Sequence, residues 1–244
     1  MVNTWENTGK IFEQISRKLL NKMGIYGARR KLRFLIDNDW KYKSILGFTE
    51  IHGYLHDNEA MKLYALALSL PQIPPPIIVE IGCFVGKSSV VLGTGLKTKK
   101  GAKMYCIDPF DATEIDFFHS EFKNISGSSL QGTFENNIKK NGLLKIVHIL
   151  AGKSNDMIKR VNDDIDLLFI DGDHEYYAVL NDFENFAPKV KSGGFVVLHD
   201  VYSKEDDVPE IMQGPRRVAE EKLYGSSEWA VIDYIGSLLV AQKK

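Results

Sequence analysis

Residues 77–88 read Ile-Ile-Val-Glu-Ile-Gly-Cys-Phe-Val-Gly-Lys-Ser, and this stretch decides the fold class. Its first five residues, Ile77–Ile81, form a short, mainly β-branched run without alternation, which predicts a strand buried on both faces. Gly82 and Gly86 follow, and residues without a Cβ let the backbone turn tightly and approach a ligand. We expect a helix to begin after this turn, with its first N–H groups facing the ligand.

The chain beyond this stretch alternates strand-like and helix-like segments. The expected strands are residues 103–107, 146–151, 165–170 and 194–198, and the expected helices are 88–96, 129–141, 154–161 and 177–190. Such alternation predicts a parallel sheet with helices on both faces. A late helix over 214–224 and a closing hairpin, 229–234 and 237–242, predict an antiparallel last strand. The expected fold is therefore α/β, a doubly wound, seven-stranded, mostly parallel sheet.

The part of the chain before the sheet is expected to be helical. Apolar residues recur at helical spacing over 5–23, and a second short helix is expected over 28–36. Asp57 resembles the N-cap of a further helix, with Ala60 in place of the usual acid three residues on. We therefore expect an N-terminal helical extension over residues 1–56 and one α/β domain over 57–244.

The composition is that of an ordinary globular protein: 244 residues, 44% hydrophobic and 26% charged. A net charge of −1 gives no overall attraction to nucleic acid or to an acidic membrane, although residues 1–45 carry a net charge of +6. No stretch has the apolar length of a membrane span, and no signal peptide is expected. Cys83 and Cys106 lie in apolar, strand-like contexts without metal-ligand spacing, which favours a reducing, cytoplasmic compartment.

The residues expected to bind a cofactor follow the strands, because in an open α/β sheet the ligand lies beyond the carboxyl ends of the strands. Asp108 ends the second strand, twenty-two residues after Gly86, where an acid can accept hydrogen bonds from ribose hydroxyls. A nicotinamide dinucleotide would use similar features, but its fingerprint requires a middle glycine in the region of Phe84. Glu80, two residues before Gly82, suits a ligand that carries an amino group rather than a pyrophosphate.

The chain resembles a known family in four motifs. These are Val79-Glu80-Ile81-Gly82 with Gly86 and Ser88 after it, Ile107-Asp108, Ala151–Asp156, and Asp171-Gly172-Asp173-His174. They look like class I S-adenosylmethionine (SAM)-dependent methyltransferases, of the catechol O-methyltransferase-like group and the bacterial macrocin and cephalosporin-tailoring branch. The resemblance runs from about Asp57 to the C-terminus and includes the terminal hairpin. A shared fold alone does not establish a function.

This resemblance implies a set of cofactor-binding residues, namely Glu80, Gly82, Gly86, Ser88, Asp108, Ser154, Asn155 and Asp171. Glu80 and Gly82 would lie near the methionine part of SAM, and Asp108 would bind the ribose. Ser154 and Asn155 would flank the adenine. Two alternatives remain open, that Ser154 only caps its helix and that Asp108 only forms a turn.

Acids and histidines follow the fourth and fifth strands. The resemblance implies that Asp171, His199 and Asp200 bind a divalent metal, Mg²⁺ or Mn²⁺, and that His174 and Asp171 are catalytic, with His174 as the general base. Oxygen ligands suit Mg²⁺, whereas an imidazole at position 199 would favour Mn²⁺, Zn²⁺ or Fe²⁺. The alternatives are a metal-free pair of a histidine and an aspartate, a capping role for Asp171, and a buried, hydrogen-bonded His199.

The expected function is SAM-dependent methyl transfer to a hydroxyl of a small metabolite, such as a sugar, glycoside or polyketide-like molecule. The acceptor class follows from the bacterial relatives that the chain resembles. Residues 37–56, 110–127 and 202–213 are expected on the acceptor side, and we expect a homo-oligomer with no nucleic-acid partner. An NAD-type oxidoreductase, a non-catalytic SAM-fold module that recruits a partner, and methylation of nitrogen remain alternatives.

Overall fold

The computed structural model describes residues 25–111, 129–161, 164–203 and 206–244. The chain forms two compact units, Met1–His52 and Gly53–Lys244, so the division falls four residues before the boundary expected after residue 56. Gly53 already belongs to the larger unit, where its carbonyl oxygen accepts a hydrogen bond from Lys87 Nζ at 2.6 Å. Among the described residues, no helix is both long enough and apolar enough to cross a membrane.

The smaller unit contains the helix α2 (Ile25–Asp37) and the 3₁₀ helix η1 (Trp40–Glu50). α2 begins three residues before the helix expected over 28–36, and η1 lies within residues 37–56, for which the sequence predicts no particular helix or strand. The rings of Phe34 and Phe48 meet edge to face at 5.4 Å and are buried. The helix expected over residues 5–23 lies outside the described residues.

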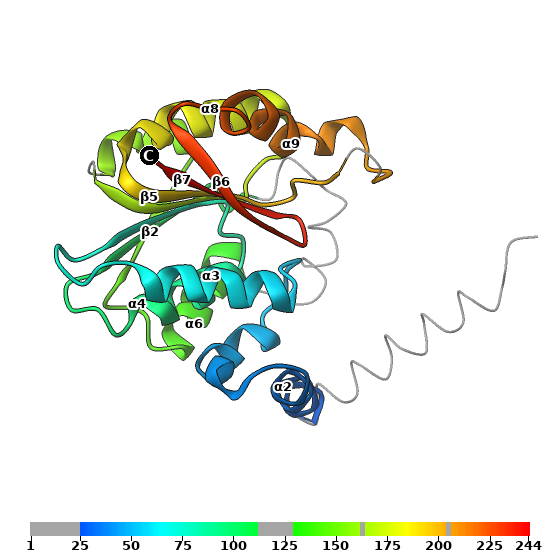
Figure 1. Ribbon diagram of the computed structural model, residues 1–244. Helices are drawn as coiled ribbons and strands as arrows, with labels where there is room; N and C mark the ends of the chain where they lie inside the picture. The colour runs from blue at the N-terminus through cyan, green and yellow to red at the C-terminus, as the bar shows by residue number, and fades with distance from the viewer. Residues whose placement is uncertain (1–24, 112–128, 162–163, 204–205) are drawn as a thin grey trace, which may run out of the picture. The chain divides into compact units, whose positions relative to one another are not determined.

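A seven-stranded sheet forms the centre of the larger unit, in the order β3-β2-β1-β4-β5-β7-β6 (Figure 1). Its strands are β1 (Ile77–Ile81), β2 (Lys103–Asp108), β3 (Val147–Ala151), β4 (Ile165–Ile170), β5 (Val190–Leu198), β6 (Trp229–Ile235) and β7 (Leu238–Lys243). The first five strands are parallel, and β7 runs antiparallel between β5 and β6. The expected fold class is therefore confirmed. β5 begins four residues earlier than expected, because Val190 pairs with Ile165 before an irregularity in register.

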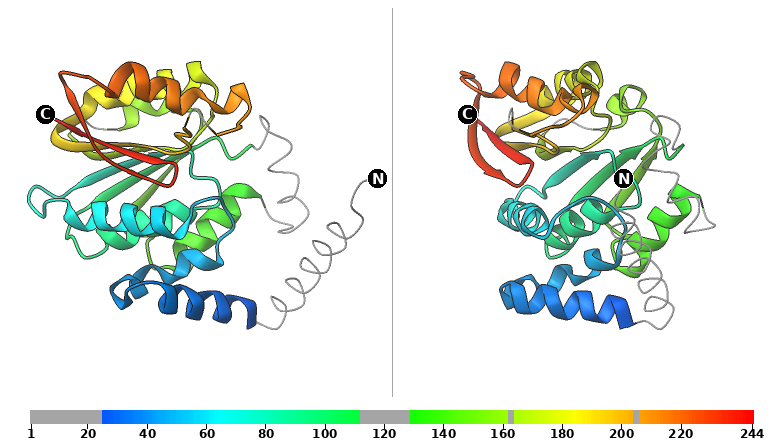
Figure 2. Two further views of the ribbon diagram at one scale, coloured as in Figure 1. Left: turned by 45° about the vertical axis from the view of Figure 1, so that its right-hand side comes forward. Right: turned by 90° about the vertical axis from the view of Figure 1, so that its right-hand side faces the viewer.

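Helices cover both faces of this sheet (Figures 1 and 2). One face carries α3 (Asp57–Ser69), α4 (Lys87–Leu96) and α6 (Leu130–Lys140), and the other carries α8 (Tyr176–Phe186) and α9 (Gly214–Val218). Shorter helical segments complete the chain: α7 (Ser154–Met157), η2 (Ile158–Arg160), η3 (Ala187–Lys189), η4 (Glu210–Met212) and the π-helix η5 (Ala219–Leu223). This arrangement is the doubly wound sheet that the alternation of segments predicts.

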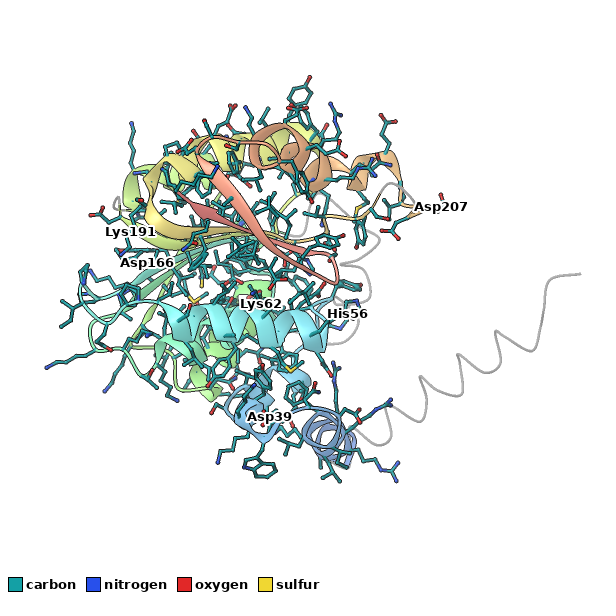
Figure 3. The ribbon with its side chains drawn as sticks, viewed as in Figure 1. Asp39, His56, Lys62, Asp166, Lys191 and Asp207 are labelled. Carbon is teal, nitrogen blue, oxygen red and sulfur yellow. The ribbon has the colours of Figure 1, made fainter. Side chains whose placement is uncertain are left out.

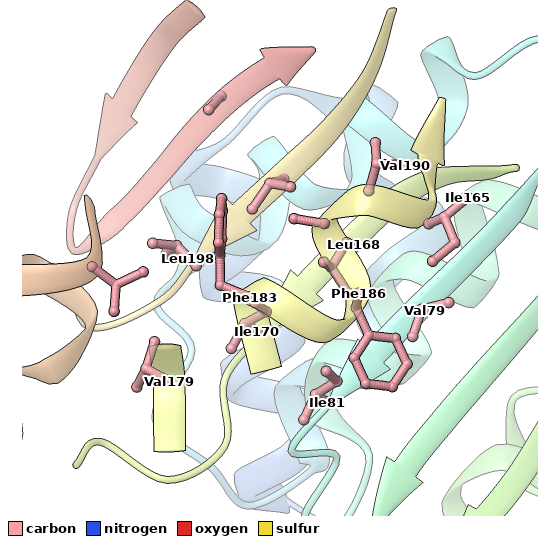
Figure 4. Close-up of a cluster of buried hydrophobic side chains, with 14 of the residues drawn as sticks. Val79, Ile81, Ile165, Leu168, Ile170, Val179, Phe183, Phe186, Val190 and Leu198 are labelled. Atoms are coloured by element: carbon pink, nitrogen blue, oxygen red, sulfur yellow. The ribbon is translucent and has the colours of Figure 1, made fainter. Parts of the chain in front are cut away.

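The central strands are buried on both faces, which explains why their sequences do not alternate. Ile78 and Val79, neighbours on β1 with opposite orientations, are both fully buried. Figure 4 shows Val79 and Leu168 in the cluster that includes Phe183 and Phe186 of α8. Burying each such side chain contributes about 1.5–3 kcal/mol. This packing holds the strand ends, and the loops that follow them, in fixed positions.

The N-cap of α3 is one residue earlier than expected, because Asp57 is already the first helical residue. His56 is the N-cap residue, and its backbone N–H donates to Glu59 Oε2 at 2.8 Å. The acid three residues after the cap is therefore present, and counting from Asp57 placed Ala60 there instead. Figure 3 labels His56 at this end of α3. Glu59 is fully buried, so the capping interaction brings a carboxylate into the interior of the larger unit.

Candidate functional site

A pocket of about 390 Å³ opens at the carboxyl ends of the parallel strands, within the size range typical of small-molecule sites. Five of the eight residues expected to bind a cofactor line this pocket: Gly82, Asp108, Ser154, Asn155 and Asp171. Asp108 is the last residue of β2, and the others come from the segments after β1, β3 and β4. The topology therefore brings together residues that are up to 89 positions apart in the chain.

The turn after β1 depends on a glycine at position 82. Gly82 has φ +85°, and a Cβ there would lie 2.1 Å from the backbone oxygen of Asp171. The turn therefore passes the loop after β4 at a distance that no side chain permits. Phe84, in the region where a dinucleotide fingerprint has glycine, also has a positive φ of 46° and lines the pocket. Such strain in a non-glycine residue is concentrated at functional sites.

Asp108 connects the turn after β1 to the end of β2. Its Oδ2 accepts hydrogen bonds from the backbone N–H groups of Cys83 and Phe84, both at 2.8 Å. Its Oδ1 accepts one from the N–H of Phe110 at 2.7 Å. The two roles expected for Asp108, ribose ligand and turn-forming acid, are thus compatible, because its carboxylate both holds the loop and faces the pocket.

Glu80 and Ser88 lie behind the pocket wall rather than on it. The carboxylate of Glu80 is fully buried and accepts hydrogen bonds from the hydroxyls of Ser88 and Ser89, each at 2.5 Å. Cys106 Sγ lies 3.5 Å from the same carboxylate, and both cysteines are buried and free. This arrangement connects β1 to the first turn of α4, whose N-cap is Gly86. Burial raises the pKa of Glu80 to about 7.

The raised pKa of Glu80 predicts a pH-dependent stability. Because the folded-state pKa lies above the ordinary value of 4.5, the folded protein binds more protons, and stability falls as pH rises through 7. Between about pH 5 and pH 8 this group should cost roughly 3 kcal/mol of unfolding free energy. Chemical denaturation across this range should show a shallower decline for Glu80→Gln than for the wild type. The exposed control Glu135→Gln should keep the wild-type slope, and parallel slopes for all three proteins would contradict the prediction.

Two residues of α8, Asn181 and Asp182, contact the residues expected to flank the adenine. Ser154 Oγ donates to Asp182 Oδ1 at 2.5 Å, and Asn155 Oδ1 accepts from Asn181 Nδ2 at 2.5 Å. Lys153 is the N-cap of α7, so Ser154 is not the capping residue. Burial raises the pKa of Asp182 to about 6. Sequence reasoning missed Asn181 and Asp182, although an acid next to Phe183 on the apolar face of a helix was a usable signal.

The structure brings the four expected reaction-centre residues together. His174 Nε2 lies 2.7 Å from Asp200 Oδ2, and His199 Nδ1 lies 2.9 Å from Asp171 Oδ1 and 3.2 Å from Asp200 Oδ2. The Nδ1 atom of His174 is buried and has no hydrogen-bond partner among the described residues. Asp200 has φ 55°, a further strained residue at this end of the sheet.

His199 is placed differently from the metal ligand that the resemblance implies. It is buried, and its Nε2 faces Glu59 Oε2 of α3 at 3.3 Å, so that both ring nitrogens face carboxylates. This is the expected alternative of a buried, hydrogen-bonded histidine. In this cluster, possible ligand atoms of Asp171, His174 and Asp200 lie within 4.8 Å of one another.

The charges in this cluster follow from burial and from the neighbouring groups. Burial opposes the charge on His199, but Asp171, Asp200 and Glu59 outweigh it and hold the pKa of His199 well above its ordinary value. Burial also opposes the charge on Glu59, but His199 and backbone N–H groups lower the pKa of Glu59 to about 2. Despite burial, His174 and His199 lower the pKa of Asp200. Burial also raises the pKa of Asp171. Burial opposes the charge on His174, but Asp200 and Asp171 outweigh it and raise the pKa of His174. The neighbouring carboxylates therefore raise the pKa of both histidines.

A family model described as a methyltransferase domain matches residues 79–201, half of the chain. The chain therefore belongs to this methyltransferase family. Its strand order and its antiparallel last strand are those of the class I SAM-dependent methyltransferase fold.

Comparison with known proteins finds one relative by sequence and several solved proteins of similar fold. An uncharacterized protein of Acanthamoeba polyphaga mimivirus is 31% identical over 156 residues, and the match spans 59% of this chain and 59% of that protein. A Corynebacterium glutamicum protein has a similar structure (TM-score 0.63, 18% identity), covering 88% of this chain and 97% of that one. The O-methyltransferase TomG of Streptomyces achromogenes, solved with SAM, has a TM-score of 0.58 and 19% identity, and the match covers 84% of this chain and 90% of TomG. A Bacillus cereus O-methyltransferase bound to S-adenosylhomocysteine (SAH) has a TM-score of 0.56 and 21% identity, and the match covers 86% of this chain and 93% of that protein.

Proposed function

We propose that this protein transfers the methyl group of SAM to a hydroxyl oxygen of a small molecule. The observation that carries the proposal is the pocket, which is lined by five residues expected to bind SAM. One of them, Asp171, also belongs to the cluster of acids and histidines. Two solved proteins of the same fold are O-methyltransferases, one with SAM and one with SAH. By analogy with tailoring enzymes, the acceptor is a sugar, a glycoside or a polyketide-like metabolite. The expected homo-oligomer and cytoplasmic location stay predictions.

Cofactor binding is assigned to the residues on the pocket wall. Asp108 would accept hydrogen bonds from the ribose hydroxyls, and Ser154 and Asn155 would flank the adenine. The methionine part would pass Gly82, where the absence of a side chain leaves the backbone accessible. Methyl transfer from a sulfonium is an in-line displacement, so holding donor and acceptor in line supplies much of the rate.

His174 suits the role of general base. Its Nε2 is held by Asp200 at 2.7 Å, which directs the proton to Nε2 and leaves the lone pair on Nδ1. As the acceptor oxygen bonds to the methyl carbon and the bond between carbon and sulfur breaks, Nδ1 takes the hydroxyl proton. The products are the methyl ether and SAH. A carboxylate that orients a histidine base is the arrangement of the serine hydrolase triad.

The donor set in this cluster also suits a divalent cation. Asp171, His174 and Asp200 would hold it, and two carboxylates with one imidazole suit Mn²⁺, Fe²⁺ or Zn²⁺ better than Mg²⁺. A cation there would lower the pKa of a bound acceptor hydroxyl. His199 would then orient the carboxylates instead of binding the metal, and His174 would be a ligand instead of the base.

Calorimetric titration with SAH, run beside NAD and with and without chelator, tests the proposed function. SAH should bind and NAD should not, because Phe84 stands in the region of the glycine that a dinucleotide requires. Asp108→Asn should weaken SAH binding about tenfold or more, since the hydrogen bonds of a charged acceptor contribute about 1.5–3 kcal/mol. Asp207→Asn, on an exposed loop, is the matched control. Binding of NAD without SAH would contradict the function, and unchanged SAH affinity in Asp108→Asn would remove Asp108 from the ribose role.

A further inference from the structure

Glu59 is a fully buried carboxylate that touches the reaction centre from a helix outside the expected site. Its Oε1 accepts hydrogen bonds from the backbone N–H of Ser237 at 2.9 Å and from the Ser237 hydroxyl at 3.0 Å. Its Oε2 accepts one from His56 N–H at 2.8 Å and faces His199 Nε2 at 3.3 Å. Donors from three separate elements therefore converge on one carboxylate, which offsets the cost of burying its charge.

The hairpin of β6 and β7 is shaped to reach this carboxylate. Gly236 in its turn has φ +64°, and a Cβ there would lie 2.5 Å from Glu59 Oε1. Lys62 on α3, labelled in Figure 3, pairs with Asp233 of β6 at 2.5 Å and fastens the same two elements. The close approach of the turn depends on glycine and lets the N–H of Ser237 reach Glu59.

His199 extends the chain of contacts from Glu59 to the proposed base. Its Nδ1 lies between Asp171 Oδ1 at 2.9 Å and Asp200 Oδ2 at 3.2 Å. Asp200 in turn holds His174 at 2.7 Å. The ring of His199 therefore contacts both carboxylates through one nitrogen and keeps them in place relative to each other.

A buried ring in this position needs a hydrogen-bond partner for its second nitrogen. Without Glu59, Nε2 of His199 would be buried without that partner, and an unsatisfied buried polar group is unfavourable. The ring would then turn away from this position. Asp200 would lose its contact with Nδ1 of His199 and would no longer hold His174 in the same place.

We propose that Glu59 is a positioning residue for methyl transfer, which holds His199 between Asp171 and Asp200 and through Asp200 sets the position of His174. The inference rests on the proposed function of His174. Among the described residues, Glu59 does not line the pocket, and its hydrogen bonds go to His56, Ser237 and His199. Its effect on the reaction therefore travels through His199, supported by the Ser237 hydroxyl, which lies 3.4 Å from Asp200 Oδ1. A role limited to capping α3 would leave the environment of His174 unchanged.

Nitrogen-15 NMR of the histidine side chains tests this in the full chain at one fixed pH, together with SAH calorimetry. In Glu59→Gln, the signals of both His199 and His174 should move away from their wild-type positions while SAH affinity stays the same. Glu59→Asp keeps the charge but shortens the side chain by one methylene, and it should move the same signals. It is the second variant, used if Glu59→Gln does not fold. Asp57→Asn removes a charge from the same first turn of α3 and should leave both histidines unchanged.

Two results separate this inference from the proposed function. Unchanged His174 signals in a folded Glu59 variant would overturn the positioning role, whether or not SAH binds. Failure of the wild type to bind SAH would overturn the proposed function and leave the histidine measurement interpretable. Movement of the His199 signals alone would limit Glu59 to a structural role and also overturn the inference.

Discussion

Replacing His174 by glutamine should lower kcat for methyl transfer by about 10²–10⁴-fold, the usual contribution of a positioned general base. Glutamine approximates the length of the imidazole and can still donate to Asp200, but it does not accept the hydroxyl proton at neutral pH. SAH affinity should stay at the wild-type value, because His174 does not line the cofactor pocket. A fall in kcat with unchanged KM for SAM would show that the lost interaction belongs to the transition state.

The measurement is the rate of SAH formation at saturating SAM, with an acceptor found by screening hydroxylated metabolites. His148→Gln is the matched control, because His148 is exposed on β3 and lies beside Tyr105, outside the acid and histidine cluster. It should keep the wild-type rate. A His174→Gln enzyme with undiminished kcat would remove His174 as the base and leave acceptor activation to another group.

Replacing Gly82 by alanine should abolish SAH binding and destabilise the fold. A Cβ at this position would lie 2.1 Å from the Asp171 backbone oxygen, so one of two strand ends must shift. A positive φ adds about 1–2 kcal/mol for a residue with a side chain. Displacing packed backbone adds to this, and we expect a total loss of about 3 kcal/mol or more in unfolding free energy. The shift would also move Asp171, which lines the same pocket.

The variant Gly193→Ala separates the cost of a positive φ from the cost of the steric clash. Gly193 has a similar φ of +79°, but nothing lies within 4 Å of a Cβ built there. Chemical denaturation should therefore show only the conformational cost for Gly193→Ala, and calorimetry should show unchanged SAH binding. Equal losses of stability in the two variants, with SAH binding retained in Gly82→Ala, would contradict the steric explanation.

The fold could be predicted because its signals are local. The mainly β-branched run Ile77–Ile81, which does not alternate, indicates a strand buried on both faces, and the alternation of segments after it indicates parallel strands joined by helices. Gly82 and Asp108 could be placed for the same reason, since a residue at the carboxyl end of a parallel strand lies at one known edge of the sheet. The start of β5 could not be predicted in the same way. The strand begins four residues before the expected position, because the pairing of Val190 with Ile165 is a contact between distant segments.

Local sequence patterns are enough to predict the class of fold and the residues at its strand ends, because periodicity and turn chemistry act within a few neighbouring residues. Which of those residues share hydrogen bonds depends on how distant segments pack in the folded chain. The contact between His199 and Glu59 joins positions 140 residues apart, and that between Ser154 and Asp182 joins positions 28 residues apart. Neither spacing is marked by any local pattern. The orientation of a buried side chain depends on every element packed around it, and for His199 these elements meet only in the folded protein.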